Sequence, residues 1–126
     1  MQYLLVLYAD EAGWPKMTQA EQQQGMAAYM AYSEALTQAG VLKGSNRLQP
    51  SSTATTVRAA NGKPQTLDGP YIDSKEQLAG YYLIDAPDLD SALSWAARCP
   101  AVNHGAVEVR PIWSMAAAGT EAERRQ

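Results

Sequence analysis

The residues best suited to chemistry lie in the DGPY turn at residues 68–71 and just after it, at Lys75. Asp-Gly and Gly-Pro are both turn dipeptides, because glycine adopts backbone angles that other residues avoid and proline fixes one of its own. Such a turn can hold Asp68 and Tyr71 in fixed directions, while Lys75 can balance an acid or an anionic ligand. The alternative is an ordinary loop, with Asp68 bonded to its own backbone, Tyr71 packed as an aromatic residue and Lys75 paired with Glu76 in solvent.

Four further side chains could contribute to the same site. His104 is the single histidine of the chain, and imidazole is the side chain that commonly exchanges protons near neutral pH. Arg110 could anchor an anionic ligand, and Tyr29 and Tyr32 could offer hydroxyls to a polar cavity. We therefore predict a pocket bordered by Asp68, Tyr71, Lys75 and Arg110, with Tyr29, Tyr32 and His104 nearby. Proton transfer in it would fall to Asp68 or His104.

Each of these residues also has a purely structural explanation. His104 lies between Asn103 and Gly105, in a predicted loop where it could be an exposed spectator. Arg110 is two residues from Glu108 on one face of a predicted strand and could simply pair with it. Tyrosines 29, 32, 81 and 82 are most simply explained as core residues, although seven tyrosines and no phenylalanine leave several hydroxyls in need of partners. The sequence leaves both interpretations open.

Charge and composition argue against several functions. The 126-residue chain carries a net charge of −3, and its ten Lys and Arg are scattered, whereas a nucleic-acid binder needs a basic face. One cysteine, Cys99, cannot form an internal disulfide; we expect a small buried residue, with a reactive thiol as the alternative. One histidine and no CxxC or HExxH pattern argue against structural zinc. We predict neither a metal nor a cofactor.

The first residues are predicted to form a buried strand. Residues 1–8 are mostly apolar but lack a basic start, and the apolar run ends at residues 9–11. That length is too short for a signal peptide with its cleavage site, or for crossing a bilayer. We therefore expect a cytoplasmic protein without a membrane partner, which the single unpaired cysteine also suits.

Two stretches have the spacing of helices. From Thr18 to Ala39 apolar residues recur at i, i+3 and i+4, Thr18 and Glu21 have capping-box spacing, and Gly40 is a natural stop. A second helix is predicted near residues 88–98, with Asp88 as its N-cap.

The other regular segments are predicted strands. They lie at 41–48, 78–85 and 106–113, and Asn61-Gly62 joins a hairpin of strands at 53–58 and 63–67. Without the hairpin the order is βαββαβ, the ferredoxin-like arrangement of an α+β protein. Its helices cover one face of an antiparallel sheet. We predict that a second copy of the chain covers the other, apolar face and makes a homodimer.

Several blocks of this sequence resemble the DGPF branch of the YCII-related proteins. They are YLLVLYADE at 3–11, TATTV at 53–57, DGPY at 68–71, KEQLAGYYLID at 75–85, PDLDSALSWAA at 87–97 and GAVEVRPI at 105–112. The resemblance implies a bacterial protein with a ferredoxin-like, dimeric α/β barrel. We interpret residues 1–113 as one YCII-related/DGPF domain and expect the tail at 114–126 to fray.

The resemblance also implies a difference in chemistry. Other YCII-type proteins present a proposed catalytic pair, a His on the first helix and an Asp just after the second. Alignment on Gly40 puts Tyr29 at the His position, and alignment on residues 95–97 puts Cys99 at the Asp position. Tyrosine, with an ordinary pKa near ~10, is a poor base at neutral pH.

Two functions therefore remain open. One is the binding of a small molecule in a cleft beside the DGPY turn, with or without acid/base chemistry. The other is a non-catalytic dimeric accessory or regulatory module. The resemblance suggests a link to extracytoplasmic-function sigma factor signalling for such a module, because genes of the DGPF branch are often found beside those factors.

Overall fold

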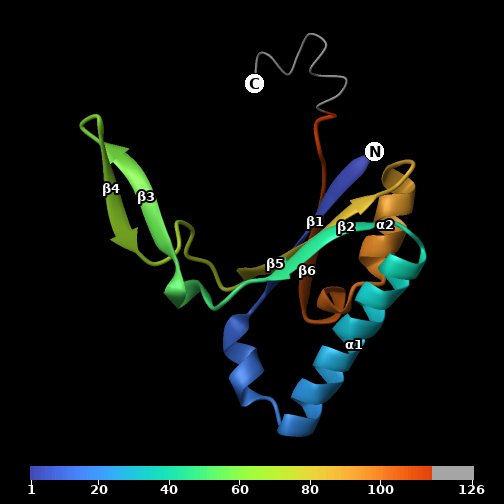
Figure 1. The fold of residues 1–126 in the computed structure, drawn as a ribbon. Coiled ribbons are helices and arrows are strands. Elements are labelled where there is room, and N and C mark those ends of the chain that lie inside the picture. Colours follow the sequence, from blue (N-terminus) through green and yellow to red (C-terminus); the bar gives the residue numbers. More distant parts are fainter. Residues whose placement is uncertain (115–126) are drawn as a thin grey trace.

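A four-stranded antiparallel sheet forms the centre of the fold (Figure 1). The computed structural model describes residues 1–114. The strands are β1 (Gln2–Ala9), β2 (Leu42–Arg47), β5 (Gln77–Asp85) and β6 (Gly105–Pro111), in the spatial order β2-β5-β1-β6. The helices α1 (Gln19–Gln38) and α2 (Leu89–Ala97) lie on one face of this sheet. The predicted ferredoxin-like α+β fold is confirmed.

The core lies between the sheet and the two helices. Alternate residues of β1 point into it, as the pleat of a strand requires, and they meet α1 there. The buried residues are Tyr3, Leu5, Leu7, Tyr32, Leu36, Tyr82, Ile84, Ala86, Ala92, Ala96, Cys99 and Ala101. Cys99 is a small buried residue, as predicted, and its burial raises the pKa of the thiol.

The helix boundaries follow from local signals. Thr18 and Glu21 form the predicted capping box, in which the Thr18 hydroxyl accepts from the Glu21 backbone N–H and the Glu21 carboxylate accepts from the Thr18 N–H. Asp88 caps α2 by accepting from the backbone N–H of Ser91 at 2.9 Å. Among residues 1–114, no helix combines the length and the apolar character needed to cross a membrane.

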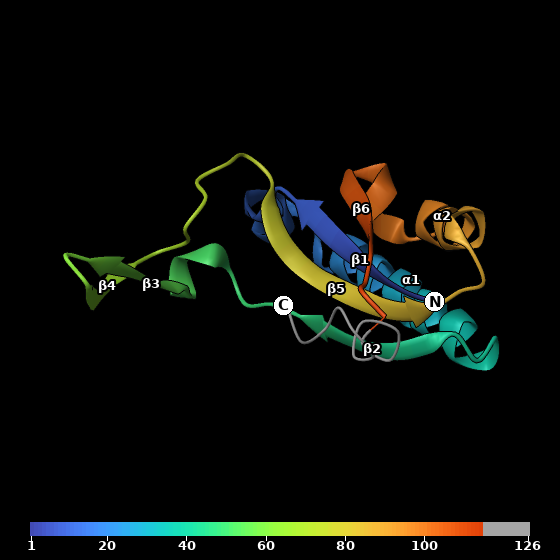
Figure 2. The same cartoon turned by 90° about the horizontal axis from the view of Figure 1, so that it is seen from above.

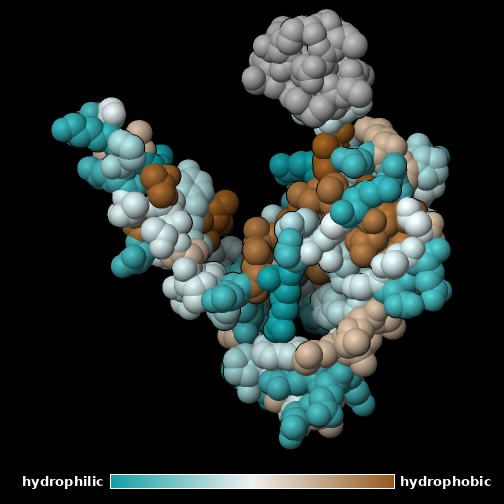
Figure 3. Space-filling view, in the orientation of Figure 1, coloured by the Kyte–Doolittle hydropathy of each residue, from teal (hydrophilic) through white to brown (hydrophobic). Residues whose placement is uncertain are grey.

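The face of the sheet away from the helices carries a second set of side chains, here called the open face. Leu4 lies opposite Leu83, and Val6 lies opposite Tyr81, so an apolar centre spans β1 and β5. Tyr81, expected in the core, lies here instead and accepts a hydrogen bond from the Asn46 amide at 2.8 Å. Figure 3 shows apolar surface gathered over the strands of the sheet.

Strands β3 (Thr55–Ala60) and β4 (Lys63–Asp68) form a separate two-stranded sheet, here called the hairpin arm. Asn61 and Gly62 have φ angles of 53° and 78°, the pair of positive values that the predicted tight Asn-Gly turn requires. The arm projects away from the main sheet (Figures 1 and 2).

Three short 3-10 helices, η1 (Glu11–Lys16), η2 (Ser51–Thr53) and η3 (Pro100–Asn103), were not predicted. Strand β3 begins two residues later than predicted because Thr53 belongs to η2, where its N–H donates to the Pro50 carbonyl at 2.9 Å. The tail predicted to fray lies, beyond Ser114, outside the described residues.

Candidate functional site

The DGPY turn is held against the start of the hairpin arm. Gly69 has a φ of 100°, which favours glycine, and its N–H donates to the Ala54 carbonyl at 2.8 Å. The Thr56 hydroxyl donates to the Gly69 carbonyl at 2.9 Å. A hollow of about 210 Å³, here called the turn pocket, is lined by Thr56, Arg58, Leu67, Asp68, Gly69, Pro70 and Tyr71. Asp68 and Tyr71 therefore line the same hollow, without Lys75 or Arg110 in its lining, and their role in binding a ligand stays a prediction.

A larger hollow of about 560 Å³ lies where the arm joins the sheet; we call it the hairpin-base pocket. One wall is η2 with the residues on either side of it, and another is the connection from the DGPY turn to β5. Its lining residues are Tyr8, Leu48, Gln49, Pro50, Ser51, Thr53–Thr56, Pro70, Tyr71, Ile72, Ser74 and Glu76–Leu78. Its volume falls in the range of about 300–1,000 Å³ typical of small-molecule sites.

Both walls of the hairpin-base pocket are tied to η1. The Glu11 carboxylate accepts from the Ser51 backbone N–H, at 2.9 and 3.2 Å, and from the Ser51 hydroxyl. The Gln77 side chain accepts from the Glu11 N–H at 3.0 Å and donates to the Ser74 carbonyl at 2.7 Å. Sequence reasoning missed Glu11 and Gln77 as positioning residues. The one sequence signal for this region was the acidic pair at residues 10–11, directly after β1. Asp10 of this pair caps η1 by accepting a hydrogen bond from the Ala12 N–H.

The hairpin-base pocket is nearly uncharged. Among the described residues that line it, Glu76 alone carries a charge at neutral pH. Aliphatic side chains, proline rings, hydroxyls and amides make up the rest of the lining. In the turn pocket, the Arg58 guanidinium lies over the ring of Tyr71, 5.3 Å from its centroid. The Arg58 guanidinium therefore already contacts the aromatic face of Tyr71.

Lys75 lies in the connection that carries the DGPY turn, but its side chain lines neither of the two described pockets. Its neighbours Ser74 and Glu76 line the hairpin-base pocket. Lys75 therefore lies between two lining residues of the hairpin-base pocket but does not line the pocket itself.

Tyr29 and Tyr32 lie on α1, on the helix side of the sheet. The Tyr32 hydroxyl donates to the Trp95 carbonyl at 2.7 Å, and its ring packs edge-to-face on Tyr82 at 5.1 Å. Burial, with smaller contributions from Cys99 and Tyr82, raises the pKa of Tyr29 to about 12. Burial also raises the pKa of Tyr32, so both phenols keep their protons at physiological pH.

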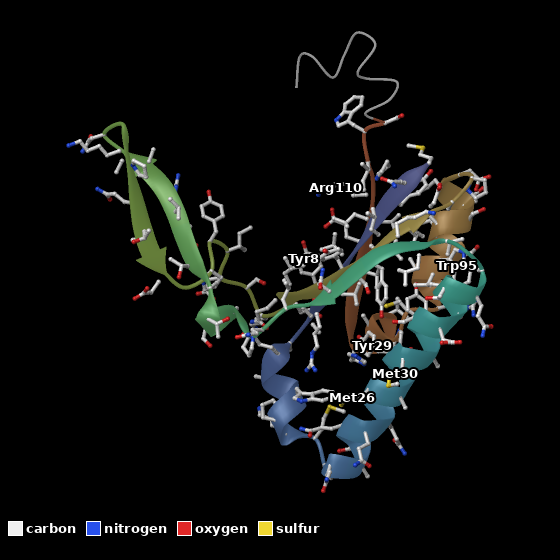
Figure 4. All side chains as sticks on the ribbon, viewed as in Figure 1. Tyr8, Met26, Tyr29, Met30, Trp95 and Arg110 are labelled. Carbon is white, nitrogen blue, oxygen red and sulfur yellow. The ribbon has the colours of Figure 1, made fainter. Side chains whose placement is uncertain are left out.

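Arg110 and His104 lie at opposite ends of β6. Arg110 pairs across the sheet with Leu4 and forms an ion pair with Glu108, as the structural explanation of its sequence position predicted. His104 is exposed and precedes Gly105, which pairs with Ala9. His104 thus lies at the same end of the sheet as Tyr8. Arg110 lies at the other end, away from Tyr8 (Figure 4). Whether these residues act on a ligand stays a prediction.

Comparison with known proteins places the chain in a family. Residues 1–116 match the model of the YCII-related domain. The chain belongs to the YCII-related family. It is 36% identical to an uncharacterised protein of Rhizobium meliloti (strain 1021) over 114 residues, which make up 89% of this chain and 92% of that relative.

A solved structure shares the fold of this YCII-related chain. It is 5-chloro-2-hydroxyhydroquinone dehydrochlorinase (TftG) from Burkholderia phenoliruptrix AC1100, in complex with 2,5-dihydroxybenzoquinone. The TM-score is 0.52 over 90% of this chain and 94% of that chain, with 17% sequence identity. At this identity the likeness concerns the fold alone. Within residues 1–114, no group of three or more His, Cys, Asp or Glu could hold a metal ion.

Proposed function

We propose that this YCII-related protein binds a small, uncharged molecule in the hairpin-base pocket. The observation that carries the proposal is a hollow of about 560 Å³ at the DGPY turn, whose walls are fixed by hydrogen bonds to η1. The same turn supports placing the chain in the DGPF branch of the family. A pocket whose walls are already held by such hydrogen bonds needs little reordering when a ligand enters.

The lining favours a planar ring that carries hydroxyl or carbonyl oxygens. Proline and aliphatic side chains offer flat apolar contact, and the hydroxyls of Tyr8 and Tyr71 can donate or accept hydrogen bonds. The fold relative TftG was solved with 2,5-dihydroxybenzoquinone, a ring of this kind, which supports the choice of probes. A carboxylate or phosphate would meet Glu76 without a cation among the described lining residues, so we expect weaker binding of anions.

Two residues are candidates for proton transfer, should the bound molecule react. Asp68 lines the adjoining turn pocket, and His104 lies at the same end of the sheet as Tyr8. Either could take a proton from a ligand hydroxyl, the carboxylate as a base and the imidazole through its unprotonated nitrogen. The proposed function requires only that the molecule binds, whether or not it then reacts.

The proposed working form is a homodimer through the open face. The motivation is that both helices cover the other face, so within residues 1–114 neither helix covers the apolar centre of Leu4, Val6 and Leu83. Stable interfaces of this kind commonly bury more than ~1,200 Å² in total. If the protein binds no small molecule, this assembly alone would favour the accessory or regulatory module.

The test is a thermal-shift screen of neutral hydroxylated benzenes and quinones beside their carboxylated analogues. We expect a neutral ring to stabilise wild type, and Tyr71→Ala to lose that stabilisation. Asp68→Asn and Tyr71→Phe measure the contributions of the two polar groups. The control is Gln65→Ala on β4, which lines neither described pocket. A ligand that stabilises Tyr71→Ala as much as wild type would show that this pocket is not the binding site. If the protein instead prefers anions, and Lys75→Met loses that preference, the anionic ligand predicted from the sequence would be supported.

A further inference from the structure

The hairpin arm and the open face lie on two sides of one gap. Figure 1 shows the arm standing away from the sheet, with the helices on the far side of the sheet, and Figure 3 shows the surface hollowed between arm and sheet. Each face of the arm exposes an apolar side chain: Val57, paired with Thr66, is 62% exposed on one face, and Leu67, paired with Thr56, is 57% exposed on the other. Whichever face of the arm turns toward the gap therefore presents surface that favours removal from water.

The arm has little within its own chain to stabilise it. Every residue of β4 is exposed, and within residues 1–114 the two strands of the arm pair only with each other. An isolated two-stranded hairpin is at best marginally stable in water, because it buries too little apolar surface. A further contact along the arm would supply the missing burial.

The hairpin-base pocket lies at the apex of this gap. Tyr8 and Leu78 are paired residues at the end of β1 and β5, and both line the pocket together with Thr55 and Thr56 of the arm. The open face, the pocket and the base of the arm are therefore one continuous surface. A molecule that fills the gap between the arm and the open face would therefore also form a wall of the hairpin-base pocket.

We propose that a second copy of the chain occupies the gap, packs against the arm and forms the missing wall of the hairpin-base pocket. A two-fold interface must be self-complementary. The open face meets that condition, because its apolar centre is accompanied by one acid and one base, Glu108 and Arg110, which can pair with their counterparts across the axis. Each copy contributes an arm and an open face. A single two-fold interface would therefore cover both arms and both open faces.

The test measures access to the pocket without a ligand. Leu78→Cys, at a position 45% exposed in the single chain, is made in a Cys99→Ala background, and its rate of maleimide labelling is followed. We expect labelling to be about tenfold slower in the dimer than in the open-face variant Leu83→Glu, because a covered site reacts only after opening. Met30→Cys on α1, at a position 71% exposed, should label equally fast in both.

Two further measurements guard against a misfolded variant. Glu108→Arg keeps the apolar centre and places like charges together, so it should weaken the dimer while circular dichroism stays native. Dilution of the Leu78→Cys protein should speed its labelling as the dimer dissociates. Equal labelling rates in dimer and monomer, or a wild type that is monomeric at micromolar concentration, would overturn the proposal.

The ligand part of this inference rests on the proposed function, and the two can fail separately. Slow labelling in the dimer, with no ring compound stabilising the protein, would refute ligand binding and leave the shared wall standing. A ring compound that binds Leu83→Glu and wild type equally well would refute the shared wall and leave the ligand site standing.

Discussion

Gly105 lies so close to β1 that a larger residue would collide with backbone. A Cβ at this position would be 1.9 Å from the Tyr8 carbonyl oxygen, whereas a Cβ at Gly44, on the opposite edge strand, would meet nothing within 4 Å. We predict that Gly105→Ala lowers the free energy of unfolding by about 1–3 kcal/mol or more, the usual cost of overpacking. Gly44→Ala is the matched control. Urea denaturation measures both, and equal losses would show that the close approach does not matter.

Tyr29 gives a prediction about alkaline stability. Its pKa is raised by burial to about 12, against an ordinary value near 10. Between these values the unfolded chain loses the phenolic proton and the folded chain keeps it, so the unfolded state binds fewer protons and the free energy of unfolding falls as pH rises. Below that range Tyr29 contributes no pH dependence.

The variant Tyr29→Phe should remove part of this alkaline fall. Urea denaturation of wild type and variant across the range from pH about 9 to about 11 measures it. We expect their difference in unfolding free energy to be constant at the lower end and to shift in favour of the variant as pH rises. A difference that stays constant throughout would contradict the raised pKa.

The elements were largely predictable because their signals are local. A continuous run of apolar residues marked β1, and the spacing of apolar residues marked α1. The Thr18–Glu21 spacing marked a helix start, and Asn61-Gly62 marked the hairpin turn. The candidate site was only partly predictable. Asp68 and Tyr71 share a turn, but the place of Arg110 depends on the register of β1 against β6, a long-range pairing that no local pattern encodes.

The 3-10 helix η1 was not predicted, although its cap at Asp10 is a local signal, and it has a testable role. Glu11 holds η2 through charged hydrogen bonds to Ser51. Glu11→Gln should lower the free energy of unfolding by up to about 1.5 kcal/mol, the lower range for bonds to charged groups. It should also speed amide exchange in η2 and the start of β3. Glu34→Gln, an exposed carboxylate on α1, is the control. Unchanged exchange in η2 would show that Glu11 does not position this wall.

At the scale of the molecule, the fold divides its apolar surface unequally. One face of the sheet packs under α1 and α2, while among residues 1–114 no helix covers the open face and the strands of the arm pair only with each other. Ferredoxin-like sheets with helices on one face only have this asymmetry built into their topology. In the proposed dimer, the interface between the two copies would therefore determine how much of this remaining apolar surface is buried.

Homodimer formation predicts a stability that depends on protein concentration. Association with a second folded copy stabilises the native state by mass action, so the Tm should rise as wild type is concentrated over about a hundredfold range. Leu83→Glu places a charge in the apolar centre of the open face and should give a lower Tm that no longer changes with concentration. Met30→Glu, on the exposed surface of α1, adds the same charge outside the proposed interface and should behave as wild type. Light scattering supplies the independent measure of mass. A monomer at micromolar concentration, with a Tm independent of concentration, would refute the dimer and with it the shared pocket wall.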